Sequence, residues 1–480
     1  MASDPGFVHT DPLQTSSSLH KPDLSATIKD VTITTISANH CSTNTVRKSH
    51  FSTEGHDRSV YSASANGSYS PTADTFWRGK VTTLFENLLS TAEYPVELHG
   101  QYLAFLNNLI VPSLGPQPSP SSTWTPHLTK EHSPFEPSWN IQGDKQQIRF
   151  TLEPVGREAG TASDILNQAH PLSFVESLAA SKLCPSLNTT WWKHFTFELF
   201  LSNPEIECLQ ELSPPARVTP TCFLAFDLPF EQFSPILKAY LFPHRRARLS
   251  GKTNTQCVIE AVKKLNSPTI SVFSALSQIE AFLDTKQPTP QQSSDTMVVS
   301  NLGGEEHGKS IEMVAIDCID PSKARIKLYV KENVSSFANV RNIFTLGGRR
   351  CGFEIDEGLK AVEKFWVALF DGTENMNLKP AFLFLGLEVV PGVEMPDVKL
   401  YIPAWTCPFR DKEITSRPSG YFTSENWDVG STFDDDFQKI SETSEGGSAK
   451  ASYTYLSFAY SVAKGPYVTL YYSPILLSGG

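Results

Sequence analysis

The clearest pattern in the chain is an alternation of apolar and polar residues near position 325. Ile326, Leu328 and Val330 fall on one face of an expected strand, and Arg325, Lys327 and Tyr329 fall on the other. A polar strand face ordinarily contacts water, but two cations and a phenol on one face suit a polyanion better than bulk solvent. Four such strands indicate a sheet whose Lys, Arg and Tyr face lines a common cavity. The other three strands carry Lys238 and Tyr240, Lys399 and Tyr401, and Tyr467, Thr469 and Tyr471.

Helical and strand patterns alternate along most of the remaining chain. Apolar residues first recur at helical spacing over residues 81–89 and 102–110. Further helices are expected at 165–183, 191–201, 230–238, 255–265, 272–282, 334–344 and 359–370. Strands are expected at 147–152, 221–227, 313–318, 325–330, 381–390, 398–402, 451–459 and 468–472.

Many of these strands come in adjacent pairs that turn residues separate. The segments 320–323 (Asp-Pro-Ser-Lys) and 463–466 (Ala-Lys-Gly-Pro) are typical hairpin turns. Helices placed between hairpins, rather than between single strands, indicate an antiparallel sheet and not a doubly wound parallel one. We therefore predict an α+β fold in which an antiparallel barrel with a polar lumen is surrounded by helices. This arrangement inverts the usual small barrel, whose interior is filled with apolar side chains.

Composition divides the chain into two parts. Residues 1–74 are rich in Ser, Thr, Asn, Asp and His and contain few large apolar side chains. Such a segment cannot bury enough surface to offset its ordering entropy, so we predict a disordered leader over 1–74 and a single domain over 75–480. Two polar stretches, 112–137 and 284–309, are expected to be loops inserted in this domain, and the first of them would contain Glu136.

Charge and cysteine usage exclude several classes of protein. The chain has 40 Lys and Arg against 51 Asp and Glu, a net charge of −11, which disfavours non-specific nucleic-acid binding. Its 8 cysteines form no Cys-x-x-Cys pair, which argues against a zinc site and a disulfide framework. The longest apolar run, 381–387, is too short to span a bilayer, and the first residues lack the features of a signal peptide. We expect a cytoplasmic protein that binds neither nucleic acid nor membrane.

Seven short motifs occur in a consistent order over roughly residues 76–475. They are Ser133-Pro134-Phe135-Glu136-Pro137-Ser138-Trp139-Asn140, Ile148-Arg149-Phe150-Thr151-Leu152-Glu153-Pro154, and the segments 159–161, 238–243, 317–329, 345–349 and 465–467. Together they resemble the fungal aromatic prenyltransferases of the dimethylallyltryptophan synthase family. The resemblance implies a ten-stranded antiparallel barrel of repeated α-β-β-α units, the ABBA barrel. It also implies transfer of a dimethylallyl group from dimethylallyl diphosphate to an electron-rich aromatic acceptor, in the biosynthesis of secondary metabolites such as alkaloids.

The resemblance assigns the cations and phenols to the diphosphate. Ionisation of the carbon–oxygen bond leaves negative charge on diphosphate, and fixed cations in a low-dielectric cavity stabilise that charge. Tyrosine faces can stabilise the allylic cation and exclude water. By family position the diphosphate-binding residues are Arg149, Lys238, Tyr240, Arg325, Lys327, Tyr329, Lys399, Tyr401, Tyr467 and Tyr471. The family often carries Gln where this chain has Lys399, and the strand register decides whether Tyr471 or its neighbour Tyr472 faces the lumen.

Two residues are expected to act on the acceptor. Glu136 matches the family position that grips the acceptor, often by accepting a hydrogen bond from an indole N–H. Lys238 is the expected base for the proton that the ring loses, because a lysine among other cations should have a lowered pKa.

No metal or other cofactor is expected. The acidic cluster Asp434-Asp435-Asp436 is followed by Phe437 and cannot complete the Asp-Asp-x-x-Asp pattern that holds magnesium in other prenyl-diphosphate enzymes. Two alternatives to an indole prenyltransferase stay open. One is a phenolic or polycyclic polyketide acceptor, and the other is a non-catalytic barrel that binds a ligand. The second is disfavoured because Arg149, Lys238, Arg325 and Lys327 are all present. Assembly as a homodimer is left open.

Overall fold

The computed structural model describes residues 71–212, 219–265, 271–285, 309–333, 335–372, 380–408, 411–441, 451–474 and 476. These residues belong to one compact unit, which spans 67–480. The predicted leader lies outside the described residues up to position 70, and helix α1 begins at Pro71. Most of the predicted loop at 284–309 also lies outside them.

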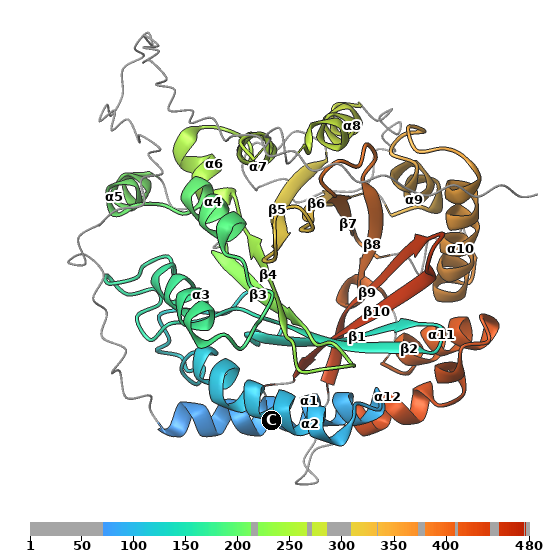
Figure 1. The fold of residues 1–480 in the computed structure, drawn as a ribbon, viewed down its shortest axis with the longest axis horizontal. Coiled ribbons are helices and arrows are strands. Elements are labelled where there is room, and N and C mark those ends of the chain that lie inside the picture. Colours follow the sequence, from blue (N-terminus) through green and yellow to red (C-terminus); the bar gives the residue numbers. More distant parts are fainter. Residues whose placement is uncertain are drawn as a thin grey trace, which may run out of the picture. The chain divides into compact units, whose positions relative to one another are not determined.

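The centre of the fold is a closed barrel of ten strands in the order β1-β10-β9-β8-β7-β6-β5-β4-β3-β2 (Figure 1). Every neighbouring pair is antiparallel, so the barrel is a sequence of hairpins closed by the pairing of β1 with β10. This confirms the predicted fold class. The strands are β1 Phe135–Gln142, β2 Lys145–Leu152, β3 Cys222–Asp227, β4 Ile236–Leu241, β5 Ser310–Asp317, β6 Ile326–Glu332, β7 Leu383–Val389, β8 Asp397–Pro403, β9 Ala451–Ser461 and β10 Gly465–Pro474.

Helices alternate with the hairpins along the chain and surround the barrel (Figure 1). None of the helices in the described residues is long and apolar enough to cross a membrane. They are α1 Pro71–Thr91, α2 Val96–Phe105, α3 Ala169–Ser181, α4 Thr190–Leu199, α5 Asn203–Glu211, α6 His244–Ser250, α7 Asn254–Lys263, α8 Phe273–Leu283, α9 Phe337–Phe344, α10 Phe353–Phe370, α11 Asp411–Ser424 and α12 Phe433–Ser441.

The alternation in the sequence explains why the hydrophobic core lies outside the barrel. On β6, Ile326, Leu328 and Val330 are fully buried and belong to the same core cluster as the helices, whereas Lys327 and Tyr329 line the lumen. On β1, the indole of Trp139 stacks on Phe433 of α12 at 5.8 Å between ring centroids. Apolar side chains on the outer face therefore hold the helices to the sheet, and the inner face is free to carry polar groups.

One strand begins where the sequence predicted a loop. Residues 135–137, including Glu136, open β1, and Phe135 packs against Phe150 at 5.3 Å between ring centroids. Pro137 misled the prediction because proline is usually excluded from a central strand. At this position the strand is paired with β2 only, since its ladder with β10 begins at Ser138.

The predicted helix at 230–238 is also wrong. This segment is irregular as far as position 235 and then enters β4 at Ile236. Its phenylalanines do have partners, because Phe230 packs on Tyr94 and Phe233 packs on Tyr102. Pro235 explains the absence of a helix, since a proline disfavours the helical conformation of the residue before it. Lys238 and Tyr240 therefore lie on a strand, as their own alternation indicated.

Candidate active site

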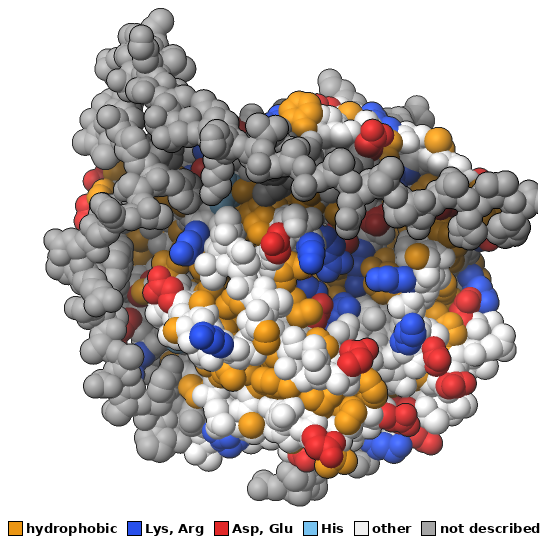
Figure 2. All heavy atoms as spheres, in the orientation of Figure 1, with side chains coloured by type: hydrophobic (Ala, Val, Ile, Leu, Met, Phe, Trp, Pro, Cys, Tyr) orange, Lys and Arg blue, Asp and Glu red, His pale blue; other side chains and the backbone are white. Residues whose placement is uncertain are grey.

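The barrel lumen contains a cavity of about 200 Å³. All ten residues that were predicted to bind diphosphate line it, and they come from strands on every side of the barrel or, for Arg325, from the residue before β6. Lys and Arg side chains gather around a hollow on the face shown in Figure 2. Because the whole chain carries a net charge of −11, this is a local concentration of cations against the overall balance.

On one side of the cavity Asp227 lies between two cations. Its carboxylate contacts Nε of Arg149 at 3.2 Å and forms a short ion pair with Nζ of Lys238. The strand register creates this group, since Asp227 on β3 is directly opposite Arg149 on β2. Burial alone would raise the pKa of Asp227, but the charges of Arg149 and Lys238 outweigh it and lower the pKa well below its usual range.

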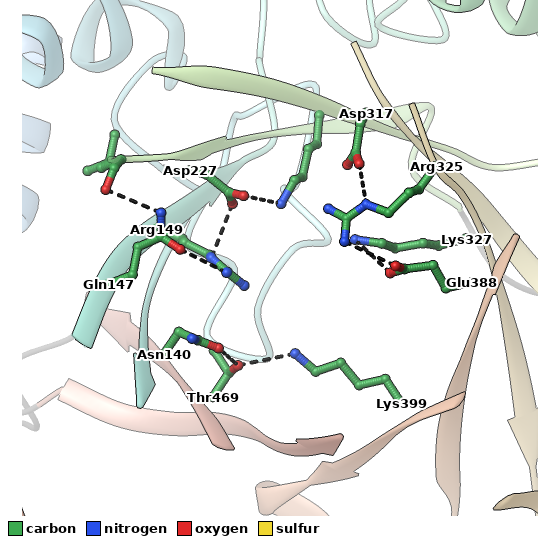
Figure 3. A network of polar contacts seen from close by, with 12 residues as sticks. Asn140, Gln147, Arg149, Asp227, Asp317, Arg325, Lys327, Glu388, Lys399 and Thr469 are labelled. Atoms are coloured by element: carbon green, nitrogen blue, oxygen red, sulfur yellow. Dashed lines mark hydrogen bonds and ion pairs between the residues drawn. The ribbon is translucent and has the colours of Figure 1, made fainter. Parts of the chain in front are cut away.

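A second group of charges lies across the cavity, around Arg325 (Figure 3). Nε of Arg325 donates to Asp317 at 2.6 Å, and its Nη1 donates to Glu388 at 3.0 Å. Nζ of Lys327 lies 3.5 Å from the same Glu388, its cross-strand partner on β7. Although burial opposes the charged form, the neighbouring cations lower the pKa of both Asp317 and Glu388. The two carboxylates are therefore ionised and hold the cations in place.

Lys399 has a different environment. Its Nζ donates to Oγ1 of Thr469 at 3.1 Å, and that hydroxyl donates to Oδ1 of Asn140 at 2.8 Å (Figure 3). The same Nζ lies 5.2 Å from the ring centroid of Tyr401 and 5.1 Å from that of Tyr467. Its surroundings are thus a hydroxyl and two aromatic faces.

The tyrosines form a continuous belt around the lumen. Ring centroids are 5.8 Å apart for Tyr240 and Tyr329, 5.4 Å for Tyr329 and Tyr401, and 6.2 Å for Tyr401 and Tyr471. The open question of register is settled by alternation along β10: Tyr471 lines the cavity with Tyr467, and Tyr472 packs outside the barrel against Tyr453. The belt offers both π faces and hydroxyls to whatever occupies the cavity.

Glu136 lies on the inner face of β1, two positions before Ser138. Strand alternation places it on the same face as Ser138 and Asn140, which line the cavity. The side chain is buried, and its Oε1 accepts a 2.6 Å hydrogen bond from Thr454. Burial raises the pKa of Glu136 to about 8, although the hydrogen bond from Thr454 opposes the shift.

This raised pKa predicts a stability change when Glu136 is replaced by Gln. The folded protein keeps a proton on Glu136 up to about pH 8, whereas the unfolded chain releases it near 4.5, so the native state is penalised progressively as pH rises between these values. The Gln variant keeps an oxygen for Thr454 and escapes the penalty. We expect its melting temperature to exceed that of the natural protein at pH 8 and to match it near pH 4.5. If the melting temperatures of the two proteins differed by the same amount at pH 4.5 and pH 8, Glu136 would not hold a proton in the folded state over this range.

Sequence reasoning missed the three carboxylates that organise the cations, Asp227, Asp317 and Glu388. Each carries a signal in hindsight, because each is an acidic residue within a predicted strand, on the face that the register sets against a lumen cation (Arg149, Lys238 or Lys327). Pairing of strands decides which cation each one meets, and that pairing is not local in sequence. Within the described parts of the chain, no group of three or more His, Cys, Asp or Glu side chains is arranged to hold a metal ion.

Comparison with known proteins gives consistent matches over most of the chain. The sequence model of the family described as tryptophan dimethylallyltransferase matches residues 73–435. A 7-dimethylallyltryptophan synthase of Aspergillus fumigatus is 29% identical over 421 residues, which are 83% of this chain and 84% of that protein. An indole diterpene prenyltransferase of Tolypocladium album is 29% identical over 457 residues, covering 88% of this chain and 98% of that protein.

Solved structures share the fold. The crystal structure of AnaPT from Neosartorya fischeri superposes with a TM-score of 0.69 at 24% sequence identity, covering 86% of this chain and 96% of that one. The barrel and its ring of helices are therefore a shared architecture.

Proposed function

The chain belongs to the tryptophan dimethylallyltransferase family and is an aromatic prenyltransferase, and on this premise we propose that it transfers the dimethylallyl group of dimethylallyl diphosphate to the indole ring of a small acceptor. The observation that carries the proposal is the pairing of two features in one cavity. Five cations, Arg149, Lys238, Arg325, Lys327 and Lys399, share the lumen with a belt of tyrosines. The cations suit a leaving diphosphate, and the tyrosine faces suit the carbocation that remains when the diphosphate leaves.

The first step is ionisation of the donor. As the carbon–oxygen bond breaks, its electron pair stays on the diphosphate, and the cations stabilise the charge that develops there. Asp227, Asp317 and Glu388 fix four of these cations, all but Lys399, before the donor arrives, so little reorganisation is needed during the reaction. The allylic cation is stabilised by tyrosine faces such as those of Tyr329 and Tyr401, which also keep water away.

The second step is attack by the aromatic ring. A carbon of the acceptor forms a bond to the allylic cation, and the ring then loses a proton to recover its aromaticity. We propose Lys238 as the base in those molecules in which it is an amine, a fraction that is accessible near neutral pH because burial lowers its pKa to about 8. In these molecules the diphosphate faces the charges of Arg149, Arg325 and Lys327, and the ring proton converts Lys238 to its ammonium form. Glu136 is proposed to bind the acceptor N–H from the inner face of β1.

Two other functions are distinguished by experiment. A phenolic acceptor would also donate a hydrogen bond to Glu136, and a decayed barrel would bind ligand without turnover. The full chain should be incubated with dimethylallyl diphosphate and, separately, with L-tryptophan, other indoles and hydroxylated polycycles, with products detected by mass spectrometry. Products from indoles alone support the proposal. Products from hydroxylated polycycles alone would show that the acceptor is a phenol and not an indole. Donor binding with no product from any acceptor would favour the binding barrel.

We predict that turnover does not require a divalent metal. The side-chain cations of the lumen supply the charge that magnesium supplies in other diphosphate enzymes, so activity should survive a large excess of EDTA. The measurement is the initial rate with and without EDTA, and with added magnesium. Complete loss of activity that magnesium restores would contradict the proposed diphosphate site.

A further inference from the structure

The five cations proposed to bind diphosphate are not equivalent, and the difference lies in their partners. Arg149 and Lys238 share Asp227, and Arg325 and Lys327 share Glu388, with Asp317 as a further partner of Arg325. Among the residues that the structure describes, Lys399 contacts no carboxylate. Figure 3 shows its side chain reaching to Thr469, apart from the two carboxylate-centred groups.

The charges on the strands around Lys399 mostly oppose a positive charge at its Nζ. Arg149 on β2, Lys238 on β4 and Lys327 on β6 all repel an ammonium at its Nζ, whereas Glu388 on β7 attracts it. Asp397, two positions earlier on the same face of β8, also lines the cavity. Tyr401 on its own strand and Tyr467 on β10 offer uncharged faces, Thr469 offers a neutral hydroxyl, and its register partner on β9 is Ala459. An ammonium in this place is expensive, because it is removed from water without an opposing charge.

We propose that Lys399 is a neutral amine in the empty cavity and takes up a proton when a diphosphate binds, so that donor binding itself creates the fifth cation. The inference rests on the proposed function, since it assigns a role to one residue of the diphosphate site. Burial, reinforced by the three neighbouring cations, lowers the pKa of Lys399 well below its usual value, which agrees with the contacts.

Diphosphate reverses the balance that keeps the amine neutral. It brings more than one negative charge among the lumen cations, and an ammonium at Nζ then gains an ionic partner in a cavity of low dielectric. The protein thereby avoids the cost of an unpaired charge while it is empty. A permanent cation such as arginine at this position would incur that cost throughout.

The test is proton uptake on binding of inorganic pyrophosphate, measured by titration calorimetry near pH 7 in two buffers of different ionisation enthalpy. The natural protein should take up roughly one proton more per site than Lys399→Gln, whose amide can still donate to Thr469 and to phosphate. The affinity of the natural protein for pyrophosphate should also fall more steeply with rising pH than that of Lys399→Gln. The reason is that a bound state with an extra proton is favoured at low pH. Protons that pyrophosphate itself exchanges are common to both proteins and cancel.

Two more variants keep the result interpretable. Lys323→Gln removes an exposed lysine in the turn before β6, outside the lumen, and it should leave the uptake of the natural protein unchanged. Lys399→Arg keeps a permanent charge and should bind pyrophosphate with the lower uptake of the Gln variant, which tests the proposal even if Lys399→Gln does not fold. Equal uptake by the natural protein and either Lys399 variant would overturn the inference and leave the proposed function intact. Failure of the natural protein to bind pyrophosphate would instead remove the diphosphate site on which both rest.

Discussion

Replacing Arg325 by Ala is expected to lower the rate of prenyl transfer roughly a hundredfold with every acceptor. The guanidinium contacts both Asp317 and Glu388 and lines the cavity, so it is held in place before the donor arrives. Its interaction strengthens as charge develops on the leaving diphosphate, which places the loss in the transition state. Steady-state kinetics with donor and acceptor each varied will measure it.

The matched control for this variant is Lys323→Ala. Lys323 is exposed in the turn two residues before Arg325, so its replacement makes the same change in net charge outside the lumen. We expect its kinetics to equal those of the natural protein. Arg325→Ala also leaves Asp317 and Glu388 without their shared partner, so the double variant Arg325→Ala, Glu388→Gln should recover part of the lost donor affinity. An unchanged rate in a folded Arg325→Ala protein would remove Arg325 from the proposed site.

The fold and the lumen-facing set could be predicted from sequence because both follow from a local rule. Alternation along a strand places Lys327 and Tyr329 on one face without any knowledge of the neighbouring strands. The same rule places Lys399 and Tyr401 on the inner face of their strand and Leu400 on the outer face. The resemblance to the family then supplied the number of strands and their closure into an antiparallel barrel.

The carboxylates could not be predicted in this way, because their roles depend on pairing across strands. Asp227 becomes the partner of Arg149 only when β2 and β3 are in register, because the two residues lie far apart in the chain. Glu388 meets Lys327 through the pairing of β6 with β7. The protonated state of Glu136 likewise depends on burial, which sequence reasoning missed when it placed this residue in a loop.

Replacing Glu136 by Ala is expected to affect the acceptor and not the donor. Glu136 lies on β1 with Thr454 as its hydrogen-bond partner, and its register partner on β2 is Thr151, two positions beyond Arg149. Its loss should lower kcat/KM for an acceptor whose ring N–H it binds, by roughly fivefold to a hundredfold, because leaving that buried N–H unpaired costs ~1–3 kcal/mol. Affinity for inorganic pyrophosphate should stay the same.

L-Tryptophan and 1-methyltryptophan form the matched pair of acceptors for this experiment, because the second carries a methyl group in place of the hydrogen on the ring nitrogen. The loss caused by Glu136→Ala should be large for the first and small for the second, whereas Arg325→Ala should slow both equally. Glu136→Gln keeps an acceptor oxygen at the same place, so it should retain more of the tryptophan activity than Glu136→Ala does. Thr454→Val serves as the control for packing around Glu136, since it removes only the hydroxyl that donates to the carboxyl group. If Glu136→Ala weakened pyrophosphate binding as much as Arg325→Ala does, Glu136 would belong to the donor site. If Glu136→Ala lowered kcat/KM equally for both tryptophans, Glu136 would not bind the ring N–H.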